Sequence, residues 1–346
     1  MAVFDAVDFD AHEGVHFFDD PKTGLRAIIA IHSTHLGPAA GGSRYWTYAS
    51  DDAAVTDALR LSRGMSYKNA MAELPMGGGK AVILKTAAPK NDAYLETFGR
   101  AVDSLGGRYV TAEDVGISDA DMVVVSRQTR HVSGLPVAGG AAGGNPGPST
   151  AEGVFRGMRA AVKHKLGRDG FAGVHVAIQG LGSVGYALAG KLAAAGAKLT
   201  VADIDEARAA KAAAEFAGRH VPVDEIMAVE ADVLSPCALG ATLNATSIEA
   251  LNVAIVAGAA NNQLATPADG ARVHARGILY APDYVINAGG IINVATEYLG
   301  SGDAEAVTKL IAKIEGRLAD IFVESDRTGT PTDVVADRMA QKLIGR

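Results

Sequence analysis

The sequence predicts an α/β fold of two domains, and three observations support this prediction. The chain has 346 residues, which is enough for two domains with sizeable cores. Short apolar segments, typical of buried strands, alternate with longer segments whose apolar residues recur at helical spacing. A segment rich in Gly, Ala and Pro, LPVAGGAAGGNPGP at residues 135–148, lies between the halves. We place the domain junction there, with a first domain at 1–140 and a second at 141–330.

The first domain is expected to contain buried strands and two amphipathic helices. Strands are predicted at residues 25–31, 81–84 and 108–111, where short apolar runs occur. The first helix follows the cap candidates Asp51 and Asp52, and the second runs through residues 95–105. The strand at 108–111 delivers Glu113 and Asp114 to its C-terminal end, which is where open α/β sheets place ligands.

The second domain begins with a helix that we expect Ser149 and Thr150 to cap. A strand at 174–179, a helix at 183–195 and a strand at 198–203 then form one βαβ unit. Further strands are predicted at 231–234, 253–257 and 278–280. Two helices are predicted at about 304–324 and 332–344, and the last of them is expected to pack back on the first domain.

Composition excludes several classes of protein. The net charge is −7 and the basic residues are scattered, so a nucleic-acid-binding face is disfavoured. No apolar run is long enough to cross a bilayer, and the acidic N-terminal segment does not resemble a signal peptide. Cys237 is the only cysteine, and no histidine pair has metal-ligand spacing, so no metal site is expected. A reducing cytoplasm is the expected location.

The segment after the strand at 174–179 predicts a dinucleotide site. It is the sequence Gly180-Leu181-Gly182-Ser183-Val184-Gly185, it opens a helix, and Asp203 ends the next strand about twenty residues later. Gly180 allows the tight turn, Gly182 the approach of the pyrophosphate, and Gly185 the packing of helix on sheet. The carboxylate of Asp203 would accept the ribose hydroxyls and repel a 2′-phosphate. This favours NAD over NADP, although Arg208 nearby weakens the preference.

The glycine-rich segments have two other possible interpretations. A glycine turn that binds nothing is the simple alternative, but the complete βαβ context makes it the weaker one. The run Gly77-Gly78-Gly79-Lys80 resembles a phosphate-binding loop. It is followed by Ala81, which has no hydroxyl for magnesium, so an NTPase is rejected.

Two lysines and an aspartate carry the chemistry. Lys68 lies in GMSYKNA near a helix end, Lys80 lies in LPMGGGKAV between three glycines and a buried strand, and Asp114 lies in YVTAEDVG. A buried lysine close to a second cation has a lowered pKa and can act as a general base. The other ammonium can hold a carboxylate. Together with the dinucleotide motif, this pattern indicates hydride transfer at a carbon that carries a carboxylate and an amine.

At these residues the chain resembles the leucine/phenylalanine/valine dehydrogenase branch of the glutamate dehydrogenase superfamily. The similar segments run nearly end to end, from GLRAIIAIHSTHLGPAAGGSR to LYAPDYVINAGGIINVA. The resemblance implies that Lys80 is the base, that Lys68 holds the substrate carboxylate and that Asp114 manages protons at the amine. It also implies an L-amino-acid oxidative deaminase that uses NAD and releases a 2-oxo acid, ammonium and NADH. Relatives assemble, so a homo-oligomer is expected.

The resemblance implies further binding residues. The implied substrate residues are Ala40, Gly41, Gly42, Met65, Ala112, Asn261 or Asn262, Ile291 and Val294, and the implied cofactor residues include Thr150, Ala238 and Asn261. The pocket residues are apolar, so a glutamate side chain would meet no opposite charge. Branched-chain substrates such as leucine or valine are expected, with phenylalanine close behind because Ala40 is small.

Some points depart from the family or stay open. Glu73 adds an acid near the glycine run, and TEYLGSGD at 296–303 differs from the commoner family pattern. Two other classes also stay open: a catalytically inactive nucleotide-binding protein of the same fold, and a hydroxy-acid reductase. The second would normally need a histidine base near the cofactor, and no histidine here lies in a glycine-flanked motif at a strand end.

Overall fold

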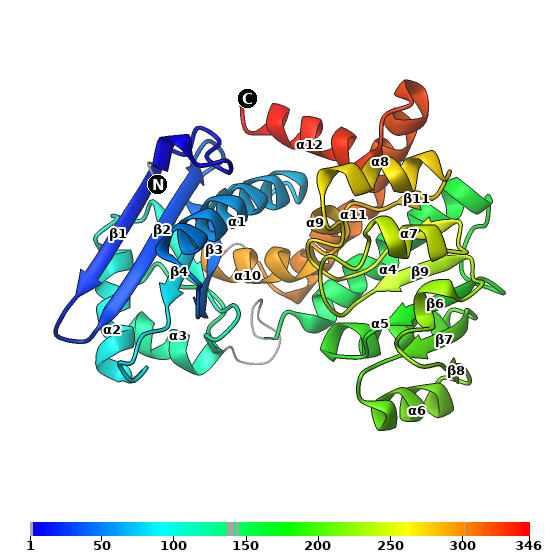
Figure 1. Ribbon diagram of the computed structural model, residues 1–346, viewed down its shortest axis with the longest axis horizontal. Helices are drawn as coiled ribbons and strands as arrows, with labels where there is room; N and C mark the ends of the chain where they lie inside the picture. Colours follow the sequence, from blue (N-terminus) through cyan, green and yellow to red (C-terminus); the bar gives the residue numbers. More distant parts are fainter. Residues whose placement is uncertain (1–2, 137–141, 143–144, 301) are drawn as a thin grey trace. The chain divides into compact units, whose positions relative to one another are not determined.

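The computed structural model describes residues 3–136, 142, 145–300 and 302–346 (Figure 1). The chain divides into two compact units, which are treated separately here. Unit 1 consists of Met1–Asn145, Asn293–Val307 and Ala340–Arg346, and unit 2 of Pro146–Ile292 and Thr308–Met339. Residues 137–141 and 143–144 of the glycine-rich segment lie outside the described residues.

Unit 1 is built on a five-stranded mixed sheet of order β1-β2-β4-β3-β5. The pairs β1–β2 and β2–β4 are antiparallel, whereas β3 pairs in parallel with β4 and β5. The strands are β1 (Gly14–Asp20), β2 (Leu25–Ser33), β3 (Ala39–Trp46), β4 (Gly77–Leu84) and β5 (Tyr109–Ala112). A short 3-10 turn, η1 (Val3–Asp5), precedes them.

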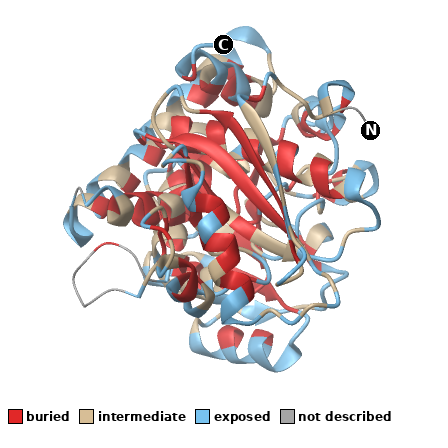
Figure 2. Ribbon diagram, turned by 90° about the vertical axis from the view of Figure 1, so that its left-hand side faces the viewer, coloured by how far each residue is buried: buried red, intermediate tan, exposed pale blue. Residues whose placement is uncertain are grey.

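Both faces of this sheet are covered, which explains the continuous apolar run of β2. Ile29 and Ile31 pack in a cluster with residues of α2 (Asp92–Asp103) and α3 (Asp119–Ser126). Ile28 and Ala30 point to the opposite face and pack with residues of α1 (Asp51–Met71). The central strands accordingly appear red in Figure 2, in which buried residues are red.

Later parts of the chain complete unit 1. Glu297, in α10 (Gly289–Leu299), accepts the backbone N–H groups of Gly134 and Leu135, each at 3.0 Å. Arg346 follows α12 (Thr332–Leu343), and its guanidinium donates to backbone carbonyls near the start of the chain. Residues about 300 positions apart in the sequence are therefore in direct contact within this unit.

Unit 2 is built on a six-stranded, fully parallel sheet of order β11-β10-β9-β6-β7-β8. Read from β8, this is the strand order of a doubly wound dinucleotide-binding fold, with the reversal between β6 and β9. The strands are β6 (His175–Gln179), β7 (Lys198–Ala202), β8 (Arg219–His220), β9 (Val233–Pro236), β10 (Ile255–Val256) and β11 (Leu279–Tyr280). The remaining helical elements are α4 (Gly147–Leu166), α5 (Ser183–Ala194), α6 (Glu206–Glu215), η2 (Ile226–Ala228), α7 (Ala245–Ala250), α8 (Pro267–Ala275), α9 (Asp283–Ile286) and α11 (Ala304–Thr328).

Three local predictions were wrong. α1 is capped by Ser50, whose side chain accepts the N–H of Ala53, so Asp51 and Asp52 lie in the first turn instead. α4 begins at Gly147, before the predicted caps Ser149 and Thr150, because Pro148 fits the first turn of a helix. The strand predicted at 81–84 begins four residues earlier, because Gly77–Gly79 and Lys80 form the first part of β4.

The residues that the structure describes contain neither a membrane-spanning helix nor a metal-binding cluster. Among them, no helix is long and apolar enough to cross a membrane. Within the same residues, no group of three or more His, Cys, Asp or Glu side chains is arranged to hold a metal ion.

Candidate active site

Strand register places several predicted site residues on one face of the unit 1 sheet. Ala40 pairs with Gly78, two residues before Lys80 on β4, and Gly42 pairs with Ala112 on β5. Aligned residues of parallel strands point the same way, and alternate residues of one strand share a face. The shared face is the one covered by α1, because Val82, two residues beyond Lys80, packs with residues of α1. It carries Ala40, Gly42, Lys80 and Ala112.

Gly41 and Gly42 are required by close backbone approach. A Cβ atom at Gly41 would overlap the carbonyl oxygen of Gly79 and lie 3.2 Å from Cγ of Met65. A Cβ atom at Gly42 would lie 2.5 Å from the carbonyl oxygen of Glu113 and 2.9 Å from Cβ of Asp114. The glycine pair therefore lets both the β4 backbone and the Asp114 turn pack directly against β3.

Lys80 and Asp114 form an ion pair in which Lys80 is buried and Asp114 is partly buried. Lys80 is 5% exposed, and its Nζ donates to Oδ2 of Asp114 at 2.5 Å. Burial lowers the pKa of the Lys80 ammonium, and the Asp114 carboxylate offsets part of that effect. For Asp114, burial alone would raise the pKa, but the adjacent Lys80 and Arg44 outweigh it and the pKa lies below its ordinary value. The pair thus combines an easily deprotonated amine with a carboxylate that stays ionised.

Arg44, which sequence reasoning missed, is the third charged residue of this cluster. Its Nε lies 3.3 Å from Oδ2 of Asp114, and its Nη1 donates to Asp57 at 3.0 Å. The available signal was its position two residues after Gly42 on the same strand, which places it on the same face. The sequence predicted no strand at residues 39–46, so the position of Arg44 relative to Gly42 could not be interpreted from the sequence alone.

Lys68 and Met65 lie in the last two turns of α1. Lys68 is half-buried, and the backbone carbonyl of the same residue accepts the N–H of Ala72 at the helix end. Met65 is also half-buried and lies against Gly41. Both residues thus belong to the helix that covers the face carrying Lys80.

The glycine motif of unit 2 has the geometry of a dinucleotide-binding turn. Gly180 has φ +94° and would place a Cβ atom 2.7 Å from that of Ala238, which follows β9. A Cβ atom at Gly185 would overlap the carbonyl oxygen of Gly180. Gly182, in contrast, has open space where its Cβ atom would lie. The outer glycines are therefore needed for packing, and the middle one leaves room for a ligand at the N-terminus of α5, next to Ser183 and Val184.

Asp203 follows β7 and supports the glycine turn. Its Oδ2 accepts the backbone N–H of Leu181 at 2.6 Å, and its Oδ1 accepts that of Asp205 at 2.9 Å. Arg208 donates to the same carboxylate at 3.3 Å. The acidic residue expected at the ribose therefore also holds the backbone of the motif in place.

The remaining predicted residues are distributed as follows. The hydroxyl of Thr150 donates to the carbonyl of Pro146. Asn261 accepts from the side chain of Asn287 at 2.7 Å, and Asn262 has a left-handed backbone with φ +51°. Ile291 belongs to unit 2 and is half-buried, whereas Val294 belongs to unit 1 and is buried.

Comparison with known proteins gives two family matches. Residues 12–131 match the model described as Glu/Leu/Phe/Val dehydrogenase, dimerisation domain, and residues 201–330 match the model described as Glutamate/Leucine/Phenylalanine/Valine dehydrogenase. The chain belongs to this family. The resemblance noted from the sequence is thereby confirmed, and the protein is an amino-acid dehydrogenase, an oxidoreductase of a class that uses a nicotinamide cofactor.

Individual relatives extend over nearly the whole chain. A leucine dehydrogenase from Thermoactinomyces intermedius is 48% identical, covering 99% of this chain and 94% of its own. A valine dehydrogenase from Streptomyces virginiae is 44% identical, covering 97% and 95%. The crystal structure of an L-tryptophan dehydrogenase from Nostoc punctiforme is similar with a TM-score of 0.87 at 41% identity, covering 96% of each chain. The two-domain α/β fold is thus confirmed.

Proposed function

We propose that the protein catalyses the reversible, NAD-dependent oxidative deamination of an apolar L-amino acid to its 2-oxo acid, ammonium and NADH. The observation that carries the proposal is the pairing of buried Lys80 with Asp114, with Lys80 on the same sheet face as Ala40 and Ala112. A base and a proton carrier are thereby held next to small apolar residues. The identity to relatives named leucine and valine dehydrogenase supports the substrate class.

The residues of this chain would divide the chemistry among them. Lys68 would hold the α-carboxylate through its positive charge. When bound, NAD supplies the acceptor for the hydride from Cα. Neutral Lys80 would remove a proton from the water that attacks the iminium carbon, and Asp114 would pass a proton to the departing amine. The lowered pKa of Lys80 supports this role, since a base must be deprotonated near working pH.

The proposed substrate is a branched-chain amino acid such as leucine or valine. Ala40 and Ala112 present no charge to a side chain, so an acidic substrate would be desolvated without compensation. Because Ala40 is small, the same site is proposed to accept phenylalanine as a second substrate. Relatives named L-tryptophan dehydrogenase are consistent with a substrate pocket whose size differs between members of this family.

NAD is proposed over NADP on the basis of the unit 2 geometry. The open space beside Gly182 fits a pyrophosphate, and the carboxylate of Asp203 would repel a 2′-phosphate. Gly180 to Gly185 and Asp203 would hold the dinucleotide, with Thr150, Ala238 and Asn261 near the nicotinamide. Asn261 or Asn262 would also contact the substrate, as would Ile291 and Val294.

Domain roles, assembly and location are proposed as follows. Residues 1–140 form the substrate-binding and oligomerisation domain, residues 141–330 form the NAD-binding domain, and the protein is a cytoplasmic homo-oligomer. β1 supports self-association because it lies at an edge of its sheet and its Phe17 is 58% exposed. Light scattering coupled to size exclusion tests this, since a monomer at micromolar concentration would contradict it.

A substrate panel tests the proposed function. Purified protein is mixed with NAD and each L-amino acid, and NADH absorbance is followed. Turnover of leucine or valine supports the proposal, and turnover of phenylalanine supports the second substrate. Silence across the panel would favour an inactive nucleotide-binding protein, and activity on hydroxy acids alone would favour a reductase.

Lys80→Ala tests the assignment of the base. Without the amine no group activates water, so turnover should fall by at least about 100-fold, whereas NAD binding, measured by calorimetry, should be unchanged. Lys85→Ala is the matched control, because Lys85 is an exposed lysine directly after the same strand. A near-normal rate for Lys80→Ala would remove the central assignment.

A further inference from the structure

We propose that Arg44 is a positioning residue for the Lys80–Asp114 pair and that Asp57 anchors it there. This inference rests on the proposed function, because it concerns the proton transfers assigned to that pair. The guanidinium bridges two carboxylates: Nε donates to Oδ2 of Asp114 at 3.3 Å, and Nη1 donates to Oδ2 of Asp57 at 3.0 Å. Arg44 does not itself exchange protons, since a guanidinium stays charged in proteins.

Arg44 and Lys80 share one oxygen of Asp114. Lys80 Nζ donates to Oδ2 at 2.5 Å, and Arg44 Nε contacts the same atom. When Lys80 loses its proton, it no longer provides a positive charge for this carboxylate. The guanidinium remains, so Asp114 keeps an ionic partner in both protonation states of Lys80. Arg44 therefore allows the lysine to become neutral without transferring its proton to Asp114.

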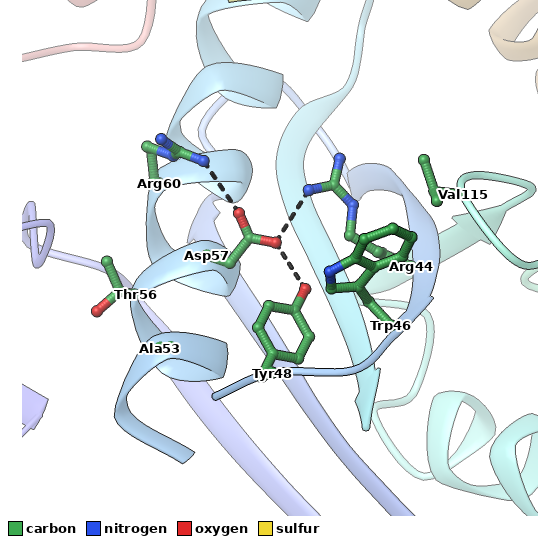
Figure 3. Close-up of a pocket in the computed structure, with 8 residues that line it drawn as sticks. All are labelled: Arg44, Trp46, Tyr48, Ala53, Thr56, Asp57, Arg60 and Val115. Carbon is green, nitrogen blue, oxygen red and sulfur yellow. Dashed lines mark hydrogen bonds and ion pairs between the residues drawn. The ribbon is translucent and has the colours of Figure 1, made fainter. Parts of the chain in front are cut away.

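The anchor of Arg44 is built into α1 and the end of β3. Asp57 is held by the Tyr48 hydroxyl at 2.6 Å and by Arg60 at 3.1 Å (Figure 3). The Asp57 side chain is 12% exposed and that of Arg44 is 24% exposed, compared with 53% for Arg60. Solvent screening is thus weaker between Arg44 and Asp57 than between Arg60 and Asp57. Tyr48 and Asp57 fix one end of the guanidinium, and its other end meets Asp114.

A pocket of about 520 Å³ is lined by Arg44 and by its anchor residues Tyr48 and Asp57, among others. Figure 3 shows Trp46 beside Arg44, with Asp57 and Tyr48 facing the guanidinium. Trp46 and Val115 are 53% and 45% exposed, so they flank the guanidinium without enclosing it. The side chain of Arg44 thus reaches from a solvent-accessible pocket to the largely buried Asp114.

The pH dependence of the reaction is the distinguishing readout. Arg44 lowers the pKa of both Lys80 and Asp114, in each case as one contribution beside burial and their own pairing. Among the other titratable side chains, Asp57 on α1 raises the pKa of Lys80, and the charge of Asp114 acts on Tyr109 of β5 and on Glu113. The helix α1 also carries the charged or titratable residues Asp51, Asp52, Arg60, Arg63, Tyr67 and Lys68. With Arg44 neutralised, the two remaining groups would both hold their protons to higher pH.

The experiment compares pH profiles of kcat/KM for leucine with saturating NAD. Arg44→Gln should move the ascending limb to higher pH by about one unit, as expected for loss of a charge within about 4–6 Å. Arg44→Lys, which keeps the charge, should restore the position of that limb. Arg26→Gln is the matched control, since it removes an exposed arginine of the same sheet that pairs with Asp19, and it should leave the profile unchanged. An unshifted profile for a folded Arg44→Gln would overturn the proposal.

A double-mutant cycle tests the anchor. Asp57→Asn should lower kcat with little change in KM, and adding it to Arg44→Gln should cause no further loss, because both act through one contact. Additive losses would contradict the coupling. If Arg44→Gln does not fold, judged by its thermal melt, Arg44→Met, which also removes the charge but keeps an unbranched side chain, replaces it in both experiments under the same criteria. An inactive wild type would instead count against the proposed function.

Discussion

Two charged side chains of this protein, Lys80 and Asp203, have a structural role as well as a charge. Lys80 is a lysine inside a central strand, and it can lie there because Asp114 pairs with it. Asp203 likewise serves the backbone, through its contact with the N–H of Leu181. A substitution at either position therefore has to separate the loss of charge from the loss of a structural hydrogen bond.

Asp203→Asn is designed to separate the two effects in unit 2. The amide oxygen of Asn can still accept the N–H of Leu181, whereas the charge that would repel a 2′-phosphate is gone. Arg208 remains close by. We expect the ratio of kcat/KM for NADP to that for NAD to rise by more than about 10-fold. Asp205→Asn is the control, since Asp205 binds the same Arg208 but is not at the turn. An unchanged ratio would argue against Asp203 as the selective group.

Ala40→Leu tests the proposed substrate pocket. Ala40 is buried on β3, on the sheet face that carries Lys80, and a larger side chain there should shorten the pocket. We expect kcat/KM for phenylalanine to fall relative to that for leucine by about 10-fold or more, corresponding to about 1–3 kcal/mol. The comparison uses initial rates with both substrates. Equal losses on both substrates would show that Ala40 does not discriminate by size.

At the scale of elements, the close packing of α1 on β4 organises the first half of the site. A Cβ atom at Gly78 would overlap the backbone nitrogen of Ser66, so helix and strand backbones are in contact there. Lys68 lies two residues after Ser66, and Lys80 lies two residues after Gly78. The spacing between the two lysines therefore depends on this contact.

Gly78→Ala should destabilise the protein, whereas Gly64→Ala should not. The Gly78 variant must separate α1 from β4, at an expected cost of about 2–3 kcal/mol, and should lower the melting temperature by about 5 °C. Gly64 is exposed on the same helix, has no atom near its Cβ position, and should gain about 0.5–1 kcal/mol from alanine. Thermal unfolding of the two variants measures the difference. Similar melting temperatures would contradict the proposed role of the contact.

On the scale of the whole molecule, unit 1 is held together by contacts between distant parts of the chain. His32 on β2 is fully buried, and its Nε2 lies 2.8 Å from the Arg346 guanidinium. The same Nε2 lies 3.2 Å from Oδ2 of Asp10, and Nδ1 lies 2.8 Å from the Ser66 hydroxyl. An unprotonated Nε2 accepts from the guanidinium, whereas a protonated Nε2 can donate to Asp10. Protonation of Nε2 would bring a second positive charge against Arg346.

This arrangement predicts acid-sensitive stability. Burial, followed by the charge of Arg346, lowers the pKa of His32 from 6.5 to about 4, with Asp10 opposing the shift. The folded state then binds fewer protons than the unfolded state between these values. The contribution of neutral His32 to the free energy of unfolding should be fully present above about pH 6.5. It should be lost, by up to about 3 kcal/mol, as the pH drops to about 4. Burial lowers the pKa of His12 as well, which acts in the same direction.

Urea unfolding at several pH values checks this prediction. His32→Gln should be less stable than wild type at pH 7, but its stability should fall less steeply between pH 6.5 and pH 4. His220→Gln is the control, because His220 is exposed. A difference between His32→Gln and wild type that does not change with pH would show that protonation of His32 is not involved.

The sequence by itself predicted the candidate chemistry-bearing residues of each unit and most of the secondary structure. Lys80, Asp114 and the motif from Gly180 to Gly185 were found because glycine positions, burial and charge leave local signals. The strand β2 was predicted because its apolar residues form a continuous run. In β3, however, two glycines and small residues hide the strand pattern, and only its pairing with β4 and β5 defines it.

Only the tertiary structure decided which distant residues act together. The bridge of Arg44 between Asp57 and Asp114, the support of Leu181 by Asp203 and the contact of Arg346 with His32 all join separate segments. Such contacts depend on strand order and register, which no local pattern encodes, because a side chain acquires its partners only when the sheet has formed.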